Sequence, residues 1–271
     1  MLWWESIVLG LVQGLTEFLP ISSSGHLVLI QYLLDISGGA DVTFEVFVHF
    51  GTVLSILTVY RREVGRMVVS VLDAVRTPST VATGYREDES FRMAMQILVT
   101  MIPTGVVYVL FKDFLEAAFG DPRLVCWMLI LTGILLVLTV LRKDPSGDMT
   151  APKAFIVGIA QSAAMIPGIS RSGATICTAL YQNVNPERAA NFSFLMLLPV
   201  VLGATLIKAL ELFELGIQAE WVPILLGTLV AYASGIAAIK ILLSVIRRGR
   251  LQYFAIYCFL VGGIGLWLIQ A

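Results

Sequence analysis

Long apolar runs separated by short polar stretches make up most of the chain. About 20 apolar residues in a helix cross a bilayer, so runs of about 18 to 21 residues predict membrane-spanning helices. A shorter run, 46–60, is extended by Phe44 and Glu45 and is predicted to span as well. The full-length runs are 93–111, 124–141, 189–207, 221–239 and 251–271. The pattern predicts an all-α polytopic membrane protein with six transmembrane helices.

Two further apolar stretches are interrupted in the middle by polar and helix-breaking residues. The stretch 7–34 contains P-I-S-S-S-G, and the stretch 154–181 contains P-G-I-S-R-S-G. Each half is too short to span, which predicts a re-entrant helix–loop–helix hairpin that enters and leaves on one face. Non-helical backbone at membrane depth is tolerated only where protein or a wet cavity surrounds it.

The two interrupted stretches are copies of one another at a constant offset of 148 residues. The matching pairs are Gly10/Gly158, Gln13/Gln161, Ile21/Ile169, Ser22/Ser170, Ser24/Ser172, Gly25/Gly173 and, in the following run, Phe44/Phe192. Each half of the chain, about 1–145 and 146–271, then holds one hairpin and three spans. An odd number of spans inverts the second half, so the sequence predicts an inverted-topology repeat.

The composition fits a single integral membrane domain over residues 1–271. Hydrophobic residues make up 58% and charged residues 14% of the sequence, and no polar half could form a second domain. The net charge of −1 argues against a nucleic-acid partner, which clustered Lys and Arg would bind. The cysteines Cys126, Cys177 and Cys258 stand singly in apolar segments, which is typical of small core residues.

The basic residues are unevenly divided between the two predicted faces. With the N-terminus outside, the opposite face receives Arg61, Arg62, Arg66, Arg76, Arg86, Arg92, Arg142, Lys143, Lys153, Arg188, Arg247, Arg248 and Arg250. The outer face receives Lys112, Arg123 and Lys208. The positive-inside rule therefore predicts both termini outside the plasma membrane and the loop 61–92 in the cytoplasm. The two hairpins then enter from opposite faces, and their tips meet near the midplane.

The predicted hairpin tips carry groups that a lipid-facing segment would avoid. Ionisable side chains at membrane depth cost roughly 2.5–3.5 kcal/mol each, so they are usually buried against protein and functional. The second half-helix of each hairpin starts just after a hydroxyl-rich loop, and helix N-termini attract anions. With the guanidinium of Arg171, the site suits an anion such as phosphate or diphosphate. Glu17 would repel this ligand unless a divalent cation lay between them.

Single residues in and near the motifs have both functional and structural interpretations. Gln13 and Glu17 share a helix face, and His26 follows the S-S-S-G turn, where it is placed for proton transfer. His49 lies within a span and is interpreted as structural or cavity-lining. At least one of the three successive serines is expected to cap the second half-helix. The G-x-x-x-G spacing at Gly10 favours close helix packing over dimerisation, and a homodimer stays open.

At these two motifs the chain resembles the undecaprenyl-diphosphate phosphatase family, also described as bacitracin-resistance proteins. Q-G-L-T-E-F-L-P-I-S-S-S-G-H resembles the family's (E/Q)-x-x-x-E pair followed by P-x-S-S-x-G-H. P-G-I-S-R-S-G-A-T resembles its second signature, P-G-x-S-R-S-x-x-T. The resemblance implies hydrolysis of undecaprenyl diphosphate to the monophosphate carrier lipid of cell-wall synthesis and inorganic phosphate, with a divalent metal, Mg²⁺ or Ca²⁺, and inverted hairpins.

The resemblance also assigns roles to single residues. The acidic motif falls on Gln13 and Glu17, so Glu17 is the expected metal ligand and Gln13 a weaker, neutral one. Ser23 is the expected nucleophile, although attack by water stays open; His26 is the expected acid/base, and Arg171 is expected to contact the transferred phosphoryl group. The residues expected to bind the diphosphate are Ser22, Ser24, Ser170, Ser172 and Thr175.

Two other classes of protein share parts of this pattern. The acid-phosphatase lipid phosphatases (PAP2-like) also have S-G-H and S-R, but their second motif needs a histidine where this chain has Cys177, so they are rejected. A lipid flippase or transporter is the alternative, because inverted repeats with broken helices are typical of transporters. The dense set of His, Glu, Arg and Ser side chains favours the enzyme.

Overall fold

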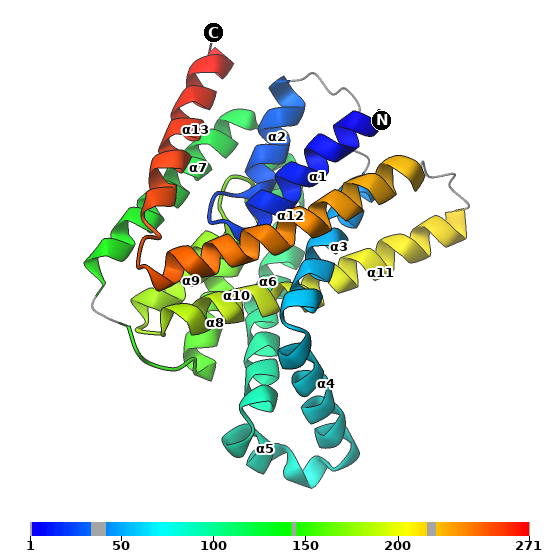
Figure 1. Ribbon diagram of the computed structural model, residues 1–271, viewed down its shortest axis with the longest axis vertical. Coiled ribbons are helices and arrows are strands. Elements are labelled where there is room, and N and C mark those ends of the chain that lie inside the picture. Colours follow the sequence, from blue (N-terminus) through cyan, green and yellow to red (C-terminus); the bar gives the residue numbers. More distant parts are fainter. Residues whose placement is uncertain (1, 34–41, 143–144, 216–220, 271) are drawn as a thin grey trace.

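The computed structural model describes residues 2–33, 42–142, 145–215 and 221–270, which form an all-helical protein (Figure 1). Within these ranges there is no β-strand, only an isolated bridge between Gly147 and Val184. The helices are α1 (Trp3–Phe18), α2 (Ser23–Leu33), α3 (Val42–Val59), α4 (Arg61–Arg76), η1 (Pro78–Thr80), α5 (Val81–Glu87), α6 (Glu89–Ala118), α7 (Pro122–Leu138), η2 (Thr139–Leu141), α8 (Ala151–Ala163), α9 (Arg171–Tyr181), α10 (Pro186–Leu195), α11 (Leu197–Leu215), α12 (Trp221–Arg247) and α13 (Tyr253–Gln270).

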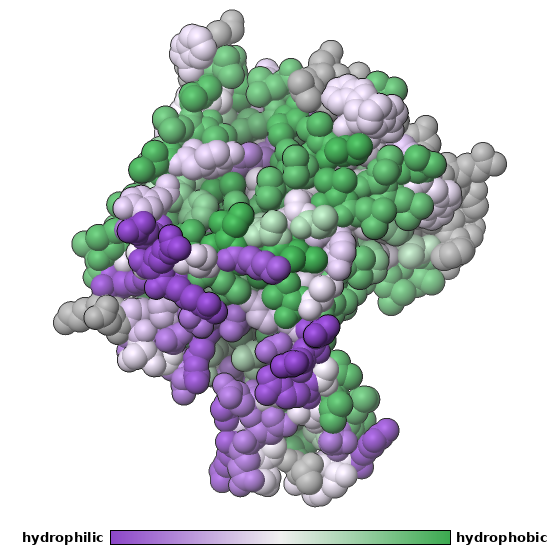
Figure 2. Space-filling view, in the orientation of Figure 1, coloured by the Kyte–Doolittle hydropathy of each residue, from purple (hydrophilic) through white to green (hydrophobic). Residues whose placement is uncertain are grey.

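Four helical segments among the described residues are long and apolar enough to cross a membrane. They are Glu89–Ala118, Pro122–Leu141, Pro186–Ile207 and Trp221–Arg247, and a fifth is added if α3 and α4, which are bent by 88° relative to each other, count as one span. Figure 2 shows hydrophobic side chains over most of the upper part of the visible face, which suits contact with lipid. The all-α, multi-pass class is therefore confirmed, and the number of six spans stays a prediction.

The two expected helix breaks lie where the sequence places them. α1 ends at Phe18, and Leu19 is extended because Pro20 disfavours a helical residue before it. α8 ends at Ala163, and α9 begins at Arg171 after a turn in which Gly168 has φ +97°. A Cβ atom on Gly168 would lie 2.4 Å from the Val125 carbonyl oxygen, so this turn requires glycine.

The second half-helix of each pair begins with the same capping hydrogen bond. The Ser22 hydroxyl accepts from the Gly25 amide at 3.2 Å, and the Ser170 hydroxyl accepts from the Gly173 amide at 3.0 Å. These pairs are the ones that the 148-residue offset matches. One copy departs in its backbone, because Ser22 has φ +69°. The expectation that one of the three serines caps the helix is confirmed.

Each broken helix pair packs against a long helix of the other half of the chain. α1 lies along α12, where a Cβ atom on Gly10 would be 2.4 Å from the Gly227 carbonyl oxygen. α8 lies along α6, where a Cβ atom on Gly158 would be 2.8 Å from Cα of Thr100. The matched glycines therefore let two pairs of helix backbones approach closely. The interpretation of Gly10 as a packing residue is confirmed within the chain.

Aromatic side chains fill the core around the two turns. Phe18 packs edge-on against Phe194, with ring centroids 5.4 Å apart, and both side chains are fully buried. The cysteines are unpaired and buried, as expected.

Away from this core, Asp88 caps α6 by accepting from the amides of Ser90 and Phe91. A hydrogen bond from the Ser70 hydroxyl, together with these amides, holds the pKa of Asp88 below its ordinary value.

Candidate active site

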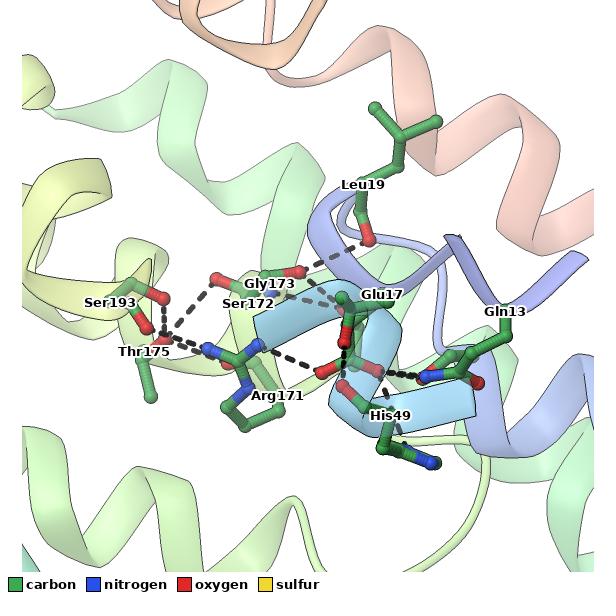
Figure 3. Close-up of polar contacts among 12 residues, drawn as sticks. Gln13, Glu17, Leu19, His49, Arg171, Ser172, Gly173, Thr175 and Ser193 are labelled. Atoms are coloured by element: carbon green, nitrogen blue, oxygen red, sulfur yellow. Dashed lines mark hydrogen bonds and ion pairs between the residues drawn. The ribbon is translucent and has the colours of Figure 1, made fainter. Parts of the chain in front are cut away.

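The turns of the two broken pairs lie in contact. A Cβ atom on Gly25 would be 3.0 Å from Cα of Gly168, and the Ser172 hydroxyl donates to the Leu19 carbonyl at 3.1 Å. Arg171 at the start of α9 reaches Glu17 at the end of α1, and its Nη2 atom lies 3.0 Å from Glu17 Oε1 (Figure 3). Residues far apart in the sequence thus form one site.

The carboxylate of Glu17 is the centre of this site. Its Oε2 atom accepts from the Ser23 hydroxyl at 2.6 Å and from Gln13 Nε2 at 2.8 Å. His49 Nε2 lies 3.7 Å from the same oxygen. The side chain is only 6% exposed, and a buried carboxylate persists where a paired cation and hydrogen bonds offset its loss of hydration.

Arg171 is held at one side of its guanidinium. Nη1 donates to the Ser193 carbonyl at 2.6 Å and Nη2 donates to Glu17, whereas Nε is buried and has no partner among the described residues. An unsatisfied donor at a buried position is unfavourable unless a ligand or water completes it. Arg171 can therefore offer hydrogen bonds to an anion that approaches Glu17 and Ser23.

A cavity of about 540 Å³ opens from this cluster, a size typical of small-molecule sites. Its lining includes Glu17, Ser23, Ser24, His49 and Arg171, and it continues along α6 past Tyr108 to Lys112 and Glu116. Its apolar wall includes Met165, Leu197, Val200 and Val201. Three pairs of lining residues are related by the 148-residue offset: Glu17/Met165, Ser23/Arg171 and His49/Leu197.

The residues expected to bind diphosphate lie in two environments. Ser24 lines the cavity, whereas Ser22, Ser170, Ser172 and Thr175 do not. These four bond mainly to the protein: besides the caps and the contact to Leu19 described above, the Thr175 hydroxyl donates to the Arg171 carbonyl at 2.7 Å. Thr175 also lies 2.7 Å from the Ser193 hydroxyl, so both residues support Arg171 from behind.

The two histidines have different surroundings. Nδ1 of His26 donates to the Ser22 carbonyl at 2.7 Å, and Nε2 lies 2.8 Å from the Tyr257 hydroxyl. Nδ1 of His49 donates to the Glu45 carbonyl at 2.8 Å, which leaves Nε2 facing Glu17. His26 is absent from the lining of the cavity, whereas His49 is part of it, as its cavity-lining interpretation allows. This geometry does not test the acid/base role expected for His26, and it makes the cavity-lining His49 a competing candidate.

Sequence reasoning did not find Ser193 or Tyr257. Ser193 follows Phe192, which the repeat matches to Phe44. The offset of 148 residues therefore makes Ser193 equivalent in sequence to Glu45. That correspondence was a usable signal for Ser193. Tyr257 lies in an apolar helix with no motif around it, and only its contact with His26 reveals it.

The oxygen atoms at Glu17 suit a divalent cation whose remaining ligands come from a phosphate group. The described part of the chain holds no cluster of three His, Cys, Asp or Glu residues that could bind a metal alone. Gln13 donates its amide nitrogen to Glu17, which leaves its buried Oε1 atom without a partner. Mg²⁺ is commonly held by one or two carboxylates and by substrate phosphates. Glu17 lines the cavity and offers such an oxygen ligand, whereas Gln13 is fully buried outside the lining, so its Oε1 atom is the weaker candidate.

Comparison with known proteins links this site to one family. The family described as Bacitracin resistance protein BacA matches residues 6–264. The undecaprenyl-diphosphatase of Salinibacter ruber is 62% identical over 99% of this chain and 100% of its own length. Those of Halothermothrix orenii and Bacteroides fragilis are 42% and 37% identical, over 96% and 99% of this chain and 95% and 98% of their own lengths. With a match that includes both broken helix pairs and nearly all of the chain, this protein belongs to the Bacitracin resistance protein BacA family.

Proposed function

We propose that this membrane protein is an undecaprenyl-diphosphate phosphatase, which releases inorganic phosphate and undecaprenyl monophosphate, the carrier lipid of cell-wall synthesis. The observation that carries the proposal is the contact of Glu17 with both Ser23 and Arg171 at the inner end of a cavity. The name undecaprenyl-diphosphatase of relatives along the full chain supports the same activity.

The lining of the cavity suits both the apolar and the charged part of this substrate. The apolar wall at Leu197, Val200 and Val201 suits the start of the polyprenyl tail, and the rest of the tail lies among the membrane helices. The diphosphate faces Arg171, Ser23 and Ser24. The guanidinium of Arg171 lines the cavity, and its planar set of N–H donors suits the oxygens of a transferred phosphoryl group.

The proposed reaction is a phosphoryl transfer in two steps. The Ser23 hydroxyl oxygen attacks the terminal phosphorus, and the bond to the bridging oxygen breaks to release undecaprenyl monophosphate. The proton of Ser23 passes through Glu17 Oε2 to His49 Nε2, which lies 3.7 Å from that oxygen. Water then hydrolyses the phosphoserine, which frees inorganic phosphate and restores the hydroxyl. Arg171 stabilises the charge on the phosphoryl oxygens in both steps. Direct attack by water on the diphosphate is the alternative to the first step.

A divalent cation, Mg²⁺ or Ca²⁺, is part of the proposal, with Glu17 as the ligand and Gln13 Oε1 as a weaker one. When bound, such an ion neutralises negative charge on the diphosphate oxygens. The support is the unpartnered Oε1 atom of Gln13, one helical turn from Glu17.

The Gln13→Glu variant tests the metal proposal. A second carboxylate beside Glu17 strengthens divalent binding, so the Mg²⁺ concentration for half-maximal phosphate release is expected to fall by about tenfold or more. The matched control is Gln161→Glu, because Gln161 occupies the equivalent repeat position and lines the same cavity but donates to the Thr104 hydroxyl at 3.0 Å rather than to Glu17. Its Mg²⁺ curve should stay at the wild-type position. Equal Mg²⁺ curves for wild type and Gln13→Glu would remove Gln13 from the metal site.

The two histidines can be separated by substitution. His49 is the competing candidate for proton transfer, so His49→Leu, which copies the residue at the equivalent position 197, is expected to lower kcat by about a hundredfold or more. His26→Gln is expected to keep kcat within about tenfold and to lower the thermal midpoint, since His26 bonds the turn at Ser22. The reverse order of kcat values would return the acid/base role to His26.

The finer architecture is also a proposal: six spans and two re-entrant hairpins in an inverted-topology repeat, with both termini outside the plasma membrane. Two structural observations support it: Ser22 and Ser170 cap the second half-helices in the same way, and α1 and α8 each pack against a long helix of the other half of the chain. The uneven division of basic residues between the two predicted faces supports the orientation. Membrane-impermeant labelling of a cysteine introduced in the segment 77–80 of intact cells tests it. Efficient labelling would contradict a cytoplasmic position for this segment.

Lipid transport is the second candidate. It is favoured by the two broken helix pairs, which are related by the sequence repeat, lie beside one cavity and each pack against a helix of the other half of the chain. Purified protein is incubated with a polyprenyl diphosphate and Mg²⁺, and inorganic phosphate is measured. Release above the level of an Arg171→Ala variant supports the phosphatase. No release, together with movement of the lipid between leaflets of vesicles, would favour transport instead.

A further inference from the structure

A second cavity, of about 650 Å³, lies on the other flank of the first broken helix pair. It is enclosed by α1, the turn that follows it, the end of α12 and the start of α13. Its lining residues are Leu15, Thr16, Leu19, Ile21, Ile241, Ser244, Val245, Arg248, Arg250, Tyr253, Phe254 and Tyr257. None of them lines the cavity of the proposed active site, so the two cavities are separate.

Two unpaired arginines line this second cavity. Among the described residues, neither Arg248 nor Arg250 has an acidic side chain within ion-pair distance, whereas the adjacent Arg247 pairs with Glu187 at 2.9 Å. A tight turn holds them together: Gly249 has φ +65°, and the Arg250 amide donates to the Val245 carbonyl at 3.1 Å, which closes the end of α12. Figure 2 shows hydrophilic surface gathered over this end of α12, directly beside hydrophobic surface.

Apart from the hydroxyls of Ser244 and Tyr253, the rest of the lining is apolar or already bonded. Leu15, Leu19 and Ile241 offer hydrocarbon surface, and Ile241 is 49% exposed. The Thr16 hydroxyl donates to the Val12 carbonyl, and the Tyr257 hydroxyl lies against His26. The lining contains no carboxylate and no histidine, so it has no group like Glu17 to accept a proton from a nucleophile. An anion in this cavity is therefore held and not hydrolysed.

Two guanidinium groups beside an apolar wall complement a lipid with a phosphate headgroup. The favourable interaction of cations with the C-terminus of α12 explains an arginine there, but it does not explain a cavity beside two of them. Basic pockets between membrane helices bind anionic headgroups, and anionic phospholipid is the phosphate-headed lipid that a bacterial bilayer supplies in excess.

We propose that this cavity is a binding site for an anionic phospholipid, whose phosphate contacts Arg248 and Arg250 and whose acyl chain packs against Leu15, Leu19 and Ile241. The acyl chain of the lipid then packs against one side of the turn between α1 and α2. Glu17 and Ser23 lie on the other side of this turn. Leu19 also accepts the hydrogen bond from Ser172 that joins the two turns. The bound lipid stabilises this contact without entering the active site.

The test uses the full-length protein purified in neutral detergent, with dioleoylphosphatidylglycerol added against dioleoylphosphatidylcholine as the uncharged-headgroup reference. The anionic lipid is expected to raise the thermal midpoint of the wild type, and phosphatidylcholine is not. In the double variant Arg248→Gln/Arg250→Gln the concentration of phosphatidylglycerol for half of this effect is expected to rise about 25-fold, about fivefold for each arginine. The matched control, Arg61→Gln/Arg62→Gln, loses the same charge from neighbouring arginines that line a different cavity, and it should respond as the wild type does.

A steric variant separates this site from general charge attraction. Ile241→Trp places a bulkier side chain on the wall proposed to hold the acyl chain and keeps both arginines, so its response to phosphatidylglycerol should also weaken. A response that persists in both Ile241→Trp and Arg248→Gln/Arg250→Gln, or equal responses to the two phospholipids in the wild type, would overturn the proposal. The proposal would also be overturned if a polyprenyl monophosphate raised the thermal midpoint of the wild type and phosphatidylglycerol did not. That result would assign the cavity to the product lipid.

Discussion

Replacing Arg171 by lysine is expected to lower kcat for phosphate release by at least about a thousandfold, although the positive charge is kept. The guanidinium contacts Glu17 through Nη2 and Ser193 through Nη1, and its buried Nε atom has no partner among the described residues. A lysine ammonium is a point donor and cannot occupy three such positions at once. The measurement is phosphate release from a polyprenyl diphosphate by purified protein at saturating Mg²⁺.

Arg188→Lys is the control for this substitution. Arg188 is half exposed and pairs with Asp148 and Glu89, away from the cavity. Its activity should remain within about twofold of wild type, because exposed ion pairs contribute little. Retention of more than about a third of the wild-type rate in Arg171→Lys would show that the fork geometry of Arg171 is not used in the reaction.

Ser23→Ala is expected to lower kcat by at least about ten-thousandfold, because the variant loses the oxygen that forms the new bond to phosphorus. The hydrogen bond of 2.6 Å from Ser23 to Glu17 Oε2 places this hydroxyl beside its proton acceptor. Single-turnover incubation with a polyprenyl diphosphate labelled in its terminal phosphate gives a second measurement, since the wild type should carry label on Ser23 and the variant should not.

Ser24→Ala is the matched control, because Ser24 lines the same cavity but contacts the Ser22 hydroxyl at 3.4 Å rather than Glu17. It should keep kcat within about tenfold of wild type, as expected for the loss of one hydrogen bond to a phosphate oxygen. Turnover of Ser23→Ala at the level of Ser24→Ala would exclude the serine nucleophile and favour attack by water.

The helical class and the two breaks could be predicted because they depend on local properties of the sequence. Apolar runs of spanning length and the residues around Pro20 and Gly168 act within a few positions of the chain, whatever surrounds them. The offset of 148 residues also identified Gly10 and Gly158 as equivalent, and both are packing residues. The same comparison could not show that each lies against a helix of the other half.

The contents of the site were harder to predict because they depend on which way each side chain faces. His26 and His49 are both single histidines in apolar segments, and the motif around His26 drew attention to it. In the structure the rotation of α3 places His49 beside Glu17, and α2 turns His26 toward Tyr257. Ser170, Ser172 and Thr175 belong to the motif as well, yet their hydroxyls bond to the backbone of the two turns or to Ser193.

Because α1 packs against a helix of the second half of the chain, its packing partner is synthesised much later than α1 itself. α1 is synthesised first but lies along α12, near the far end of the chain, and at about 5–20 residues per second the interval is on the order of ten to forty seconds. During this time Gly10 faces no partner helix, and for most of it Glu17 has no Arg171 to offset its charge. The first broken helix pair therefore lacks its main packing partner until α12 has been synthesised. A nascent chain that stops before Trp221 would therefore expose its Glu17 segment to quality-control proteases.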